Sequence, residues 1–171
     1  VYASQNPERL RGLVLSSTAA RHVPAESADA FERLGGQAAR KAAEDFFSQP
    51  EEKYWQVYLE TCMPFYNQTV QDPAKNAGQI LRPEVLFHSW QPGGGDKDMN
   101  LLDDLTHANV PAWVLTGQED PITPPARSRE IADCLPHLYN LDIVPGAGHG
   151  VYRDKPEWFQ ENLYRFADYL G

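Results

Sequence analysis

The distribution of apolar residues predicts three strands that are buried on both faces. Residues 10–18 form an apolar run that small polar residues close, and residues 112–116 and 139–144 are two further apolar runs of strand length. Continuous runs of this kind are typical of parallel strands in an α/β sheet, whereas half-exposed strands alternate between apolar and polar side chains. We therefore expect a parallel sheet.

Helical segments accompany the predicted strands. The apolar residues of 156–170 recur at helical spacing, and residues 125–134 separate the last two strands as a second helix. Residues 1–5 are expected to be the end of a helix that stops ahead of Pro7, because proline disfavours helix at the residue before it. A strand–helix–strand–helix order predicts an α/β fold with helices on both faces of the sheet.

The segment between the first and second strands has a different character. Helices are predicted there over residues 31–34, 38–47, 50–60 and 73–81. Pro50 suits a first helical turn, and the three glycines at 93–95 suit a return link. We therefore divide the chain into a partial core of residues 1–19 and 99–171 and an inserted helical cap of residues 20–98.

Composition limits the classes of partner. The 171 residues are 42% hydrophobic and carry a formal charge of −9. A negative charge of this size argues against nucleic acid and anionic membranes as partners, and no apolar run reaches the ~20 residues of a membrane span. Cys62 and Cys134 are too few for a disulfide framework and are expected to pack as small apolar residues. This usage suits a cytoplasmic protein.

Two motifs carry the candidate chemistry. Residues 110–124 and 144–150 each lead from a strand into a turn rich in glycine or proline, and they present Asp120 and His149. Residues beyond the carboxyl ends of parallel strands meet at one edge of the sheet. A carboxylate that orients an imidazole supplies two members of a catalytic triad. Taken singly, Asp120 could cap the following helix and His149 could bond to local backbone; their matching contexts favour the catalytic pair.

These motifs resemble the C-terminal half of the α/β-hydrolase superfamily. The similarity covers residues 7–15, 105–124, 144–149 and 156–170. It implies that Asp120 is the triad acid, that His149 is the general base and that a serine on a G-x-S-x-G turn is the nucleophile. This turn is absent from the chain, so we expect the nucleophile upstream of Val1. None of the possible substitutes has such a turn; they are Ser4, Ser16, Ser17, Ser48 and Ser128.

The aromatic residues of the cap resemble those of the proline-iminopeptidase-like branch, peptidase family S33. This resemblance implies a small amide, a peptide cleaved at its N-terminal residue, or an ester as substrate, and it implies no cofactor. Phe87 and Trp90 are expected to line the substrate pocket. Glu44 or Glu60 could bind a substrate ammonium group, although both are also typical of solvated helix faces. The remaining histidines have no metal-ligand spacing, so no metal site is expected.

Two expectations follow for the isolated chain. It should be inactive, because the nucleophile and the oxyanion-hole donors lie in an N-terminal half that is its expected partner. The apolar strand at 13–15 has no charge or bulge to protect an open edge, so the chain should dimerise or aggregate. The alternative is a self-standing, non-catalytic α/β module that binds a partner, and a stable, cooperatively folding monomer would favour it.

Overall fold

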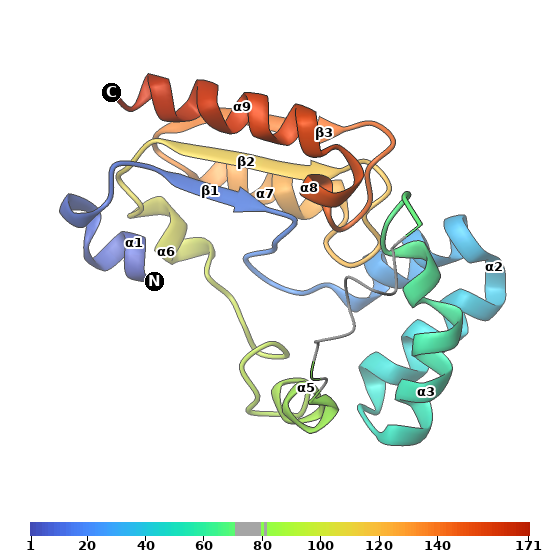
Figure 1. Ribbon diagram of the computed structural model, residues 1–171. Helices are drawn as coiled ribbons and strands as arrows, with labels where there is room; N and C mark the ends of the chain where they lie inside the picture. The colour runs from blue at the N-terminus through green and yellow to red at the C-terminus, as the bar shows by residue number, and fades with distance from the viewer. Residues whose placement is uncertain (71–79, 81) are drawn as a thin grey trace.

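A computed structural model describes residues 1–70, 80 and 82–171 of the chain. Within this part, β1 (Leu13–Ser16), β2 (Ala112–Gly117) and β3 (Leu138–Val144) form a parallel sheet in the order β1-β2-β3 (Figure 1). All six residues of β2 are buried, which confirms the expectation from its continuous apolar run. β2 pairs with β1 on one side and with β3 on the other.

One face of the sheet is covered by three helices, α1 (Tyr2–Gln5), α6 (Leu102–Thr106) and α7 (Pro125–Cys134). Val114 of β2 packs there in a cluster with Ile131 of α7. A short 3₁₀ helix at Pro7–Arg9 links α1 to β1. The bounds of α7 agree with the predicted helix over residues 125–134.

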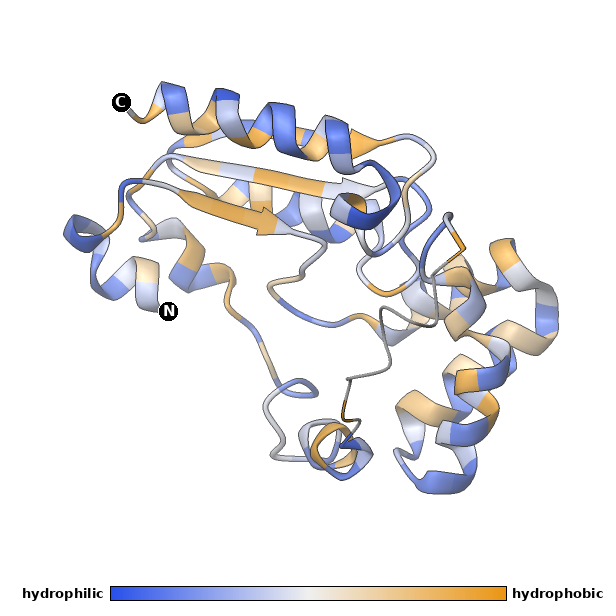
Figure 2. Cartoon of the chain, viewed as in Figure 1, coloured by the Kyte–Doolittle hydropathy of each residue, from blue (hydrophilic) through white to orange (hydrophobic). Residues whose placement is uncertain are grey.

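The other face is covered by α8 (Val151–Asp154) and α9 (Pro156–Tyr169). Ala112 and Val114 of β2 pack on the first face. Trp113 lies between them and points to the other face, because successive strand residues point to opposite sides. It packs in a cluster with Phe166 of α9, and its indole Nε1 donates a 2.7 Å hydrogen bond to Asp142. Figure 2 shows the apolar side of α9 turned toward the apolar strands. The sheet is thus covered on both faces, as the order of elements predicts.

The segment predicted to form a cap, called the cap below, lies beyond the carboxyl ends of the strands (Figure 1). Its described elements are α2 (Pro24–Ser48), α3 (Glu52–Thr61), the 3₁₀ helix η2 (Met63–Phe65) and α5 (Pro83–Ser89). The two helices predicted over 31–34 and 38–47 are parts of α2, which breaks at Gly36 with φ 73°. The helix predicted over 73–81 falls outside the described residues, apart from residue 80.

The prediction for Pro50 was wrong in position. We expected Pro50 in the first helical turn, but α3 begins at Glu52 and Glu51 is its N-cap residue. The two residues after Ser48 instead form the turn between α2 and α3, in which Glu51 N–H donates to the Gln49 carbonyl. A proline is equally compatible with such a turn because its fixed φ suits both settings.

An aromatic core holds the cap together. Phe31, Phe46, Phe47 and Tyr58 are buried in one cluster with Cys62. The Cys62 Sγ donates to the Ala39 carbonyl at 3.4 Å, and burial raises the pKa of this thiol to about 12. Cys62 therefore packs as a small apolar side chain rather than reacting as a thiolate.

Polar contacts join the cap to the core. The Arg127 guanidinium of α7 lies 2.8 Å from the Glu26 carboxylate of α2. The Ser27 hydroxyl, also in α2, donates to the Ile122 carbonyl at 3.0 Å. The first turns of α2 are thereby fixed against the loop that follows β2.

His22 lies where the chain passes from the core into the cap. Its ring is edge-on to the rings of Phe47 and Trp90, with centroid distances of 5.1 and 4.3 Å. Burial lowers the pKa of His22 to about 4; the negative charge of Asp96 opposes this shift and the positive charge of Arg127 adds to it. The folded protein therefore keeps this imidazole neutral.

This environment predicts a pH-dependent stability. Between pH 6.5 and about 4 the unfolded chain protonates His22 while the folded chain does not, so the stability due to neutral His22 is present above pH 6.5 and is lost as the pH falls. The free energy of unfolding should fall by on the order of 2 kcal/mol over this range, a value reduced from that of the full pKa shift because the ring is partly exposed. In urea unfolding of the protein, His22→Phe should remove this slope, while the exposed control His137→Asn should retain it. An unchanged slope in His22→Phe would contradict the assignment.

Candidate active site

Asp120 lies in the turn after β2, and its carboxylate is completely buried. The backbone N–H groups of Ile122 and Thr123 both donate to Oδ1 at 2.9 Å. The hydroxyls of Thr116 and Thr123 donate to Oδ2 at 3.2 and 2.9 Å. Asp120 therefore organises its own turn and does not cap α7, whose N-cap residue is Pro124.

His149 lies in the loop between β3 and α8, and about a third of its side chain is exposed. Its Nδ1 is 3.0 Å from Oδ2 and 3.1 Å from Oδ1 of Asp120. An ionised carboxylate only accepts hydrogen bonds, so Nδ1 carries the proton and Nε2 is left as an acceptor when the ring is neutral. Within the described part of the chain, no hydrogen bond of Nε2 is found.

Two glycines allow the strand and loop backbones to approach closely enough for this pair to form. A Cβ on Gly117, at the end of β2, would lie 2.2 Å from the carbonyl oxygens of Ala147 and Gly148. A Cβ on Gly148 would lie 2.2 Å from the Tyr66 carbonyl oxygen. Any side chain at either position would push the His149 loop away from Asp120 or from the cap.

A cavity of about 420 Å³ opens beside His149. Its lining comes from the end of β1, from the cap segment after η2 and from α8 and α9, and comprises Ser16, Ser17, Tyr66, Asn67, His149, Gly150, Tyr152, Arg153 and Phe159. Ser17 has a positive φ of 47°, a conformation that non-glycine residues adopt rarely and that often accompanies functional sites. Ser16 and Ser17 thus share the cavity with His149, but no hydrogen bond between either serine and His149 is found in the described residues.

The residues predicted to bind substrate lie elsewhere. Phe87 and Trp90 pack against the aromatic core of the cap, with Phe87 near Phe46 and Trp90 stacked on Phe47. Neither lines the cavity beside His149, so their role in substrate binding stays a prediction. Periodicity could not place them, because the same aromatic spacing serves helix packing and a pocket wall.

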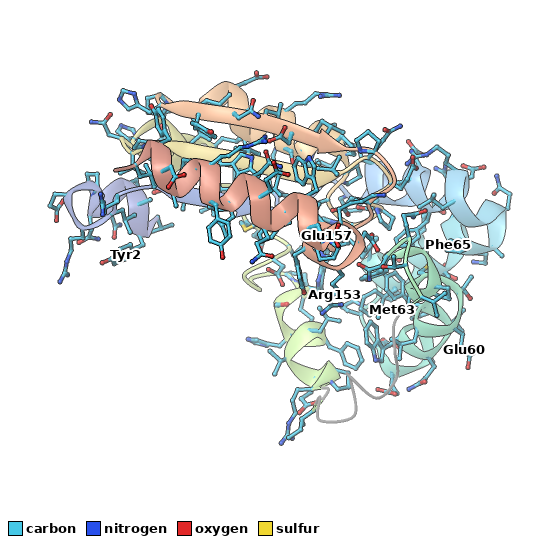
Figure 3. The ribbon with its side chains drawn as sticks, turned by 45° about the horizontal axis from the view of Figure 1, so that its top comes forward. Tyr2, Glu60, Met63, Phe65, Arg153 and Glu157 are labelled. Atoms are coloured by element: carbon cyan, nitrogen blue, oxygen red, sulfur yellow. The ribbon has the colours of Figure 1, made fainter. Side chains whose placement is uncertain are left out.

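The two glutamates considered for binding a substrate ammonium group, Glu44 and Glu60, are also outside this cavity. Glu44 is exposed and its carboxylate pairs with Arg40 at 2.8 Å. Glu60 is exposed on α3 (Figure 3). Both positions agree with the alternative that these glutamates lie on solvated helix faces.

Sequence reasoning missed the residues that hold the pair in place. Thr116 and Thr123 donate to Asp120, and the Tyr66 carbonyl accepts a 2.6 Å hydrogen bond from the His149 N–H. Asp154 accepts a 2.7 Å hydrogen bond from the Gly148 N–H. The spacing of Asp120 to Thr123 is typical of a side chain that caps its own turn and could have been noticed. Nothing local indicates Tyr66, which is more than eighty residues from His149 along the chain.

Two features of the described residues bear on other chemistries. No group of three or more histidine, cysteine, aspartate or glutamate side chains within these residues could hold a metal ion. None of the helices in the described ranges is long and apolar enough to cross a membrane.

The chain has the fold of solved α/β hydrolases. The chain is similar to the crystal structure of proline iminopeptidase from Mycobacterium smegmatis, with a TM-score of 0.71 and 21% identity over 98% of this chain and 60% of that one. It is also similar to VinJ, with a TM-score of 0.67 and 19% identity over 99% of this chain and 61% of that one. At these identities the likeness shows the fold.

Sequence comparison identifies the family. The protein-family model described as serine aminopeptidase, S33, matches residues 1–156 of this sequence. The chain therefore belongs to this family of α/β hydrolases. Epoxide hydrolase EphH from Mycobacterium tuberculosis (strain ATCC 25618 / H37Rv) is 32% identical over 68 residues, which are 39% of this chain and 32% of that protein. The chain spans about 60% of the length of the two solved structures.

The hydrogen bonds around Asp120 predict a measurable loss of stability. Thr123→Val keeps the side-chain shape but removes the 2.9 Å hydroxyl donor to Oδ2. Hydrogen bonds to charged groups contribute about 1.5–3 kcal/mol, and the free energy of unfolding should fall by that amount. Urea unfolding of the protein measures this loss. The control Thr18→Val, at a partly buried site, should change stability by less than about 0.5 kcal/mol. Equal effects of the two variants would show that the Thr123 hydroxyl contributes nothing specific.

Proposed function

We propose that this chain contributes the acid and the general base of a serine hydrolase, with Asp120 as the acid and His149 as the base. The observation that carries the proposal is the 3.0 Å contact between Asp120 Oδ2 and His149 Nδ1. The carboxylate is completely buried, whereas the imidazole lines a cavity. A buried carboxylate holds the ring in one orientation and tautomer and stabilises the imidazolium that forms during reaction.

The mechanism follows from the free nitrogen of His149. Nε2 accepts the proton of a serine hydroxyl as the oxygen attacks the substrate carbonyl, and the resulting imidazolium is stabilised by Asp120. His149 then donates this proton to the leaving amine or alcohol, and in the second half-reaction it deprotonates a water molecule. We place the serine in the part of the full-length protein that precedes Val1, on a G-x-S-x-G turn, together with the oxyanion-hole donors.

We propose small amides, peptides cleaved at their N-terminal residue, or small esters as substrates. Membership of the serine aminopeptidase family supports the first two. The similarity to a proline iminopeptidase structure points the same way, and a thermophilic esterase with 23% identity and a TM-score of 0.64 supports esters as a further choice. The volume of about 420 Å³ beside His149 suits a small acyl group.

Substitution of the pair should abolish turnover in the full-length protein. Asp120→Asn should lower kcat about 10⁴-fold, because the imidazole loses its preferred tautomer, and His149→Ala should lower it at least about 10⁴-fold. Hydrolysis of proline p-nitroanilide and p-nitrophenyl acetate measures both. The matched controls Asp168→Asn and His137→Ala, at exposed positions, should retain activity. Wild-type turnover that survives His149→Ala would reject the proposed base.

Covalent labelling tests the nucleophile independently. A fluorophosphonate probe should modify one serine of the full-length protein upstream of Val1, and peptide mass spectrometry identifies the site. The isolated 171-residue chain should be neither labelled nor active, because it would lack the nucleophilic serine. It would also lack the oxyanion-hole donors, which alone contribute ~10²–10³ in rate. Labelling of Ser16 or Ser17 would instead place the nucleophile within this chain.

A further inference from the structure

Asp154, at the end of α8, holds a buried carboxylate between the core and the cap. From the core it accepts the 2.7 Å hydrogen bond of the Gly148 N–H. From the cap it accepts hydrogen bonds from the backbone N–H groups of Gln68 and Thr69, at 3.0 and 2.9 Å, and a further one from the Thr69 hydroxyl. One side chain therefore binds the residue before His149 and a segment that lies more than eighty residues away.

The charge of Asp154 is maintained by these donors. Burial alone would favour the neutral acid, but the Thr69 hydroxyl and the N–H groups of Gln68, Gly148 and Thr69 together lower the pKa of Asp154 below its usual value. Hydrogen bonds to a carboxylate are stronger than those between neutral groups. Asp154 is thus an anion that both segments solvate in place of water.

Two further contacts join the same segments. The His149 N–H donates a 2.6 Å hydrogen bond to the Tyr66 carbonyl. The Gly148 backbone lies so close to Tyr66 that a Cβ would be 2.2 Å from the Tyr66 carbonyl oxygen. Figure 3 labels Arg153 of α8 and Met63 of η2, which belong to the two elements that carry or precede the joined segments. The loop that carries His149 is consequently bonded on one side to Asp120 and on the other to cap residues 66–69.

We propose that Asp154 is a positioning residue that fixes the His149 loop to the cap segment 66–69. Through the Gly148 N–H it sets the distance and angle at which the imidazole meets Asp120. The orientation of His149 then depends on the cap, and the cavity wall at Tyr66 and Asn67 moves together with the base. The proposal rests on the proposed role of His149 for its kinetic consequence, but not for its structural one.

The structural consequence is tested without activity. In the full-length protein with ¹⁵N-labelled histidine, the ring of His149 should give one set of NMR signals, those of the tautomer protonated at Nδ1. In Asp154→Asn, the amide hydrogens lie against N–H groups that donate hydrogen bonds to the wild-type carboxylate. The His149 loop should then shift, the contact between Nδ1 and Asp120 should weaken, and the tautomer protonated at Nε2 should become populated. The substitution should also speed hydrogen exchange at the Gly148 amide at least about 10-fold relative to the β2 amides. The exposed control Asp168→Asn, on α9, should change neither readout.

The kinetic consequence separates positioning from simple loss of structure. With p-nitrophenyl acetate, Asp154→Asn should lower kcat by about 10- to 100-fold and leave KM within about 3-fold, because a small misplacement of a catalytic group costs rate rather than binding. Thr69→Val removes the hydroxyl that Asp154 accepts, and it should shift the same readouts in the same direction by a smaller amount. This weaker variant keeps the test usable if Asp154→Asn does not fold.

The outcomes distinguish the two proposals. An inactive wild-type protein would reject the proposed function, while the NMR and exchange results would still decide the position of His149. Unchanged His149 signals and unchanged kcat in a folded Asp154→Asn protein would overturn the positioning role. A parallel rise in KM and fall in kcat, with the His149 tautomer intact, would also overturn it, since it would assign Asp154 to cavity shape alone.

Discussion

The buried carboxylate of Asp120 imposes the strictest requirement on this structure. An ionised group out of contact with water costs several kcal/mol unless hydrogen bonds replace its solvation. Thr116 of β2, the turn at Ile122 and Thr123, and the imidazole of His149 supply these partners. Because the donors come from the strand, its turn and the neighbouring loop, satisfying one anion brings three segments into register.

The close packing of backbones around this anion explains where glycine is required. Gly117 ends β2 directly beneath the carbonyl groups of the His149 loop, and Gly148 lies against the Tyr66 carbonyl. Steric room at these two positions allows the loop to reach both Asp120 and the cap. The close backbone contacts at these two glycines and the hydrogen bonds to Asp120 therefore hold the site together.

The cap presents two different surfaces. Its aromatic side chains face inward and form their own core around Phe46 and Tyr58, whereas the segment after η2 turns its backbone toward His149. Tyr66 takes part in both, since its hydroxyl lies 2.6 Å from that of Tyr58 and its ring lies edge-on to His149 with centroids 5.8 Å apart. Tyr66 therefore contacts both the core of the cap and the imidazole beside the cavity.

The sequence by itself determined the strands, the α/β class and the pairing of an acidic turn with a histidine turn. Continuous apolar runs mark strands buried on both faces, and residues that follow parallel strands share an edge, so Asp120 and His149 could be placed near each other. The helix ends were less well determined, as Pro50 shows, because proline suits a turn as well as a first helical residue. Local sequence patterns are sufficient to predict those features of the fold that depend only on burial and on the direction of the strands.

The tertiary structure decided which distant groups complete the site. Tyr66 and Asp154 hold the His149 loop although they belong to segments more than eighty residues apart, and no periodicity links them. The same limit explains Phe87 and Trp90, whose spacing fits either a cap core or a pocket wall until the partner surface is known. Sequence patterns report which face of an element is apolar; only the folded chain shows what that face meets.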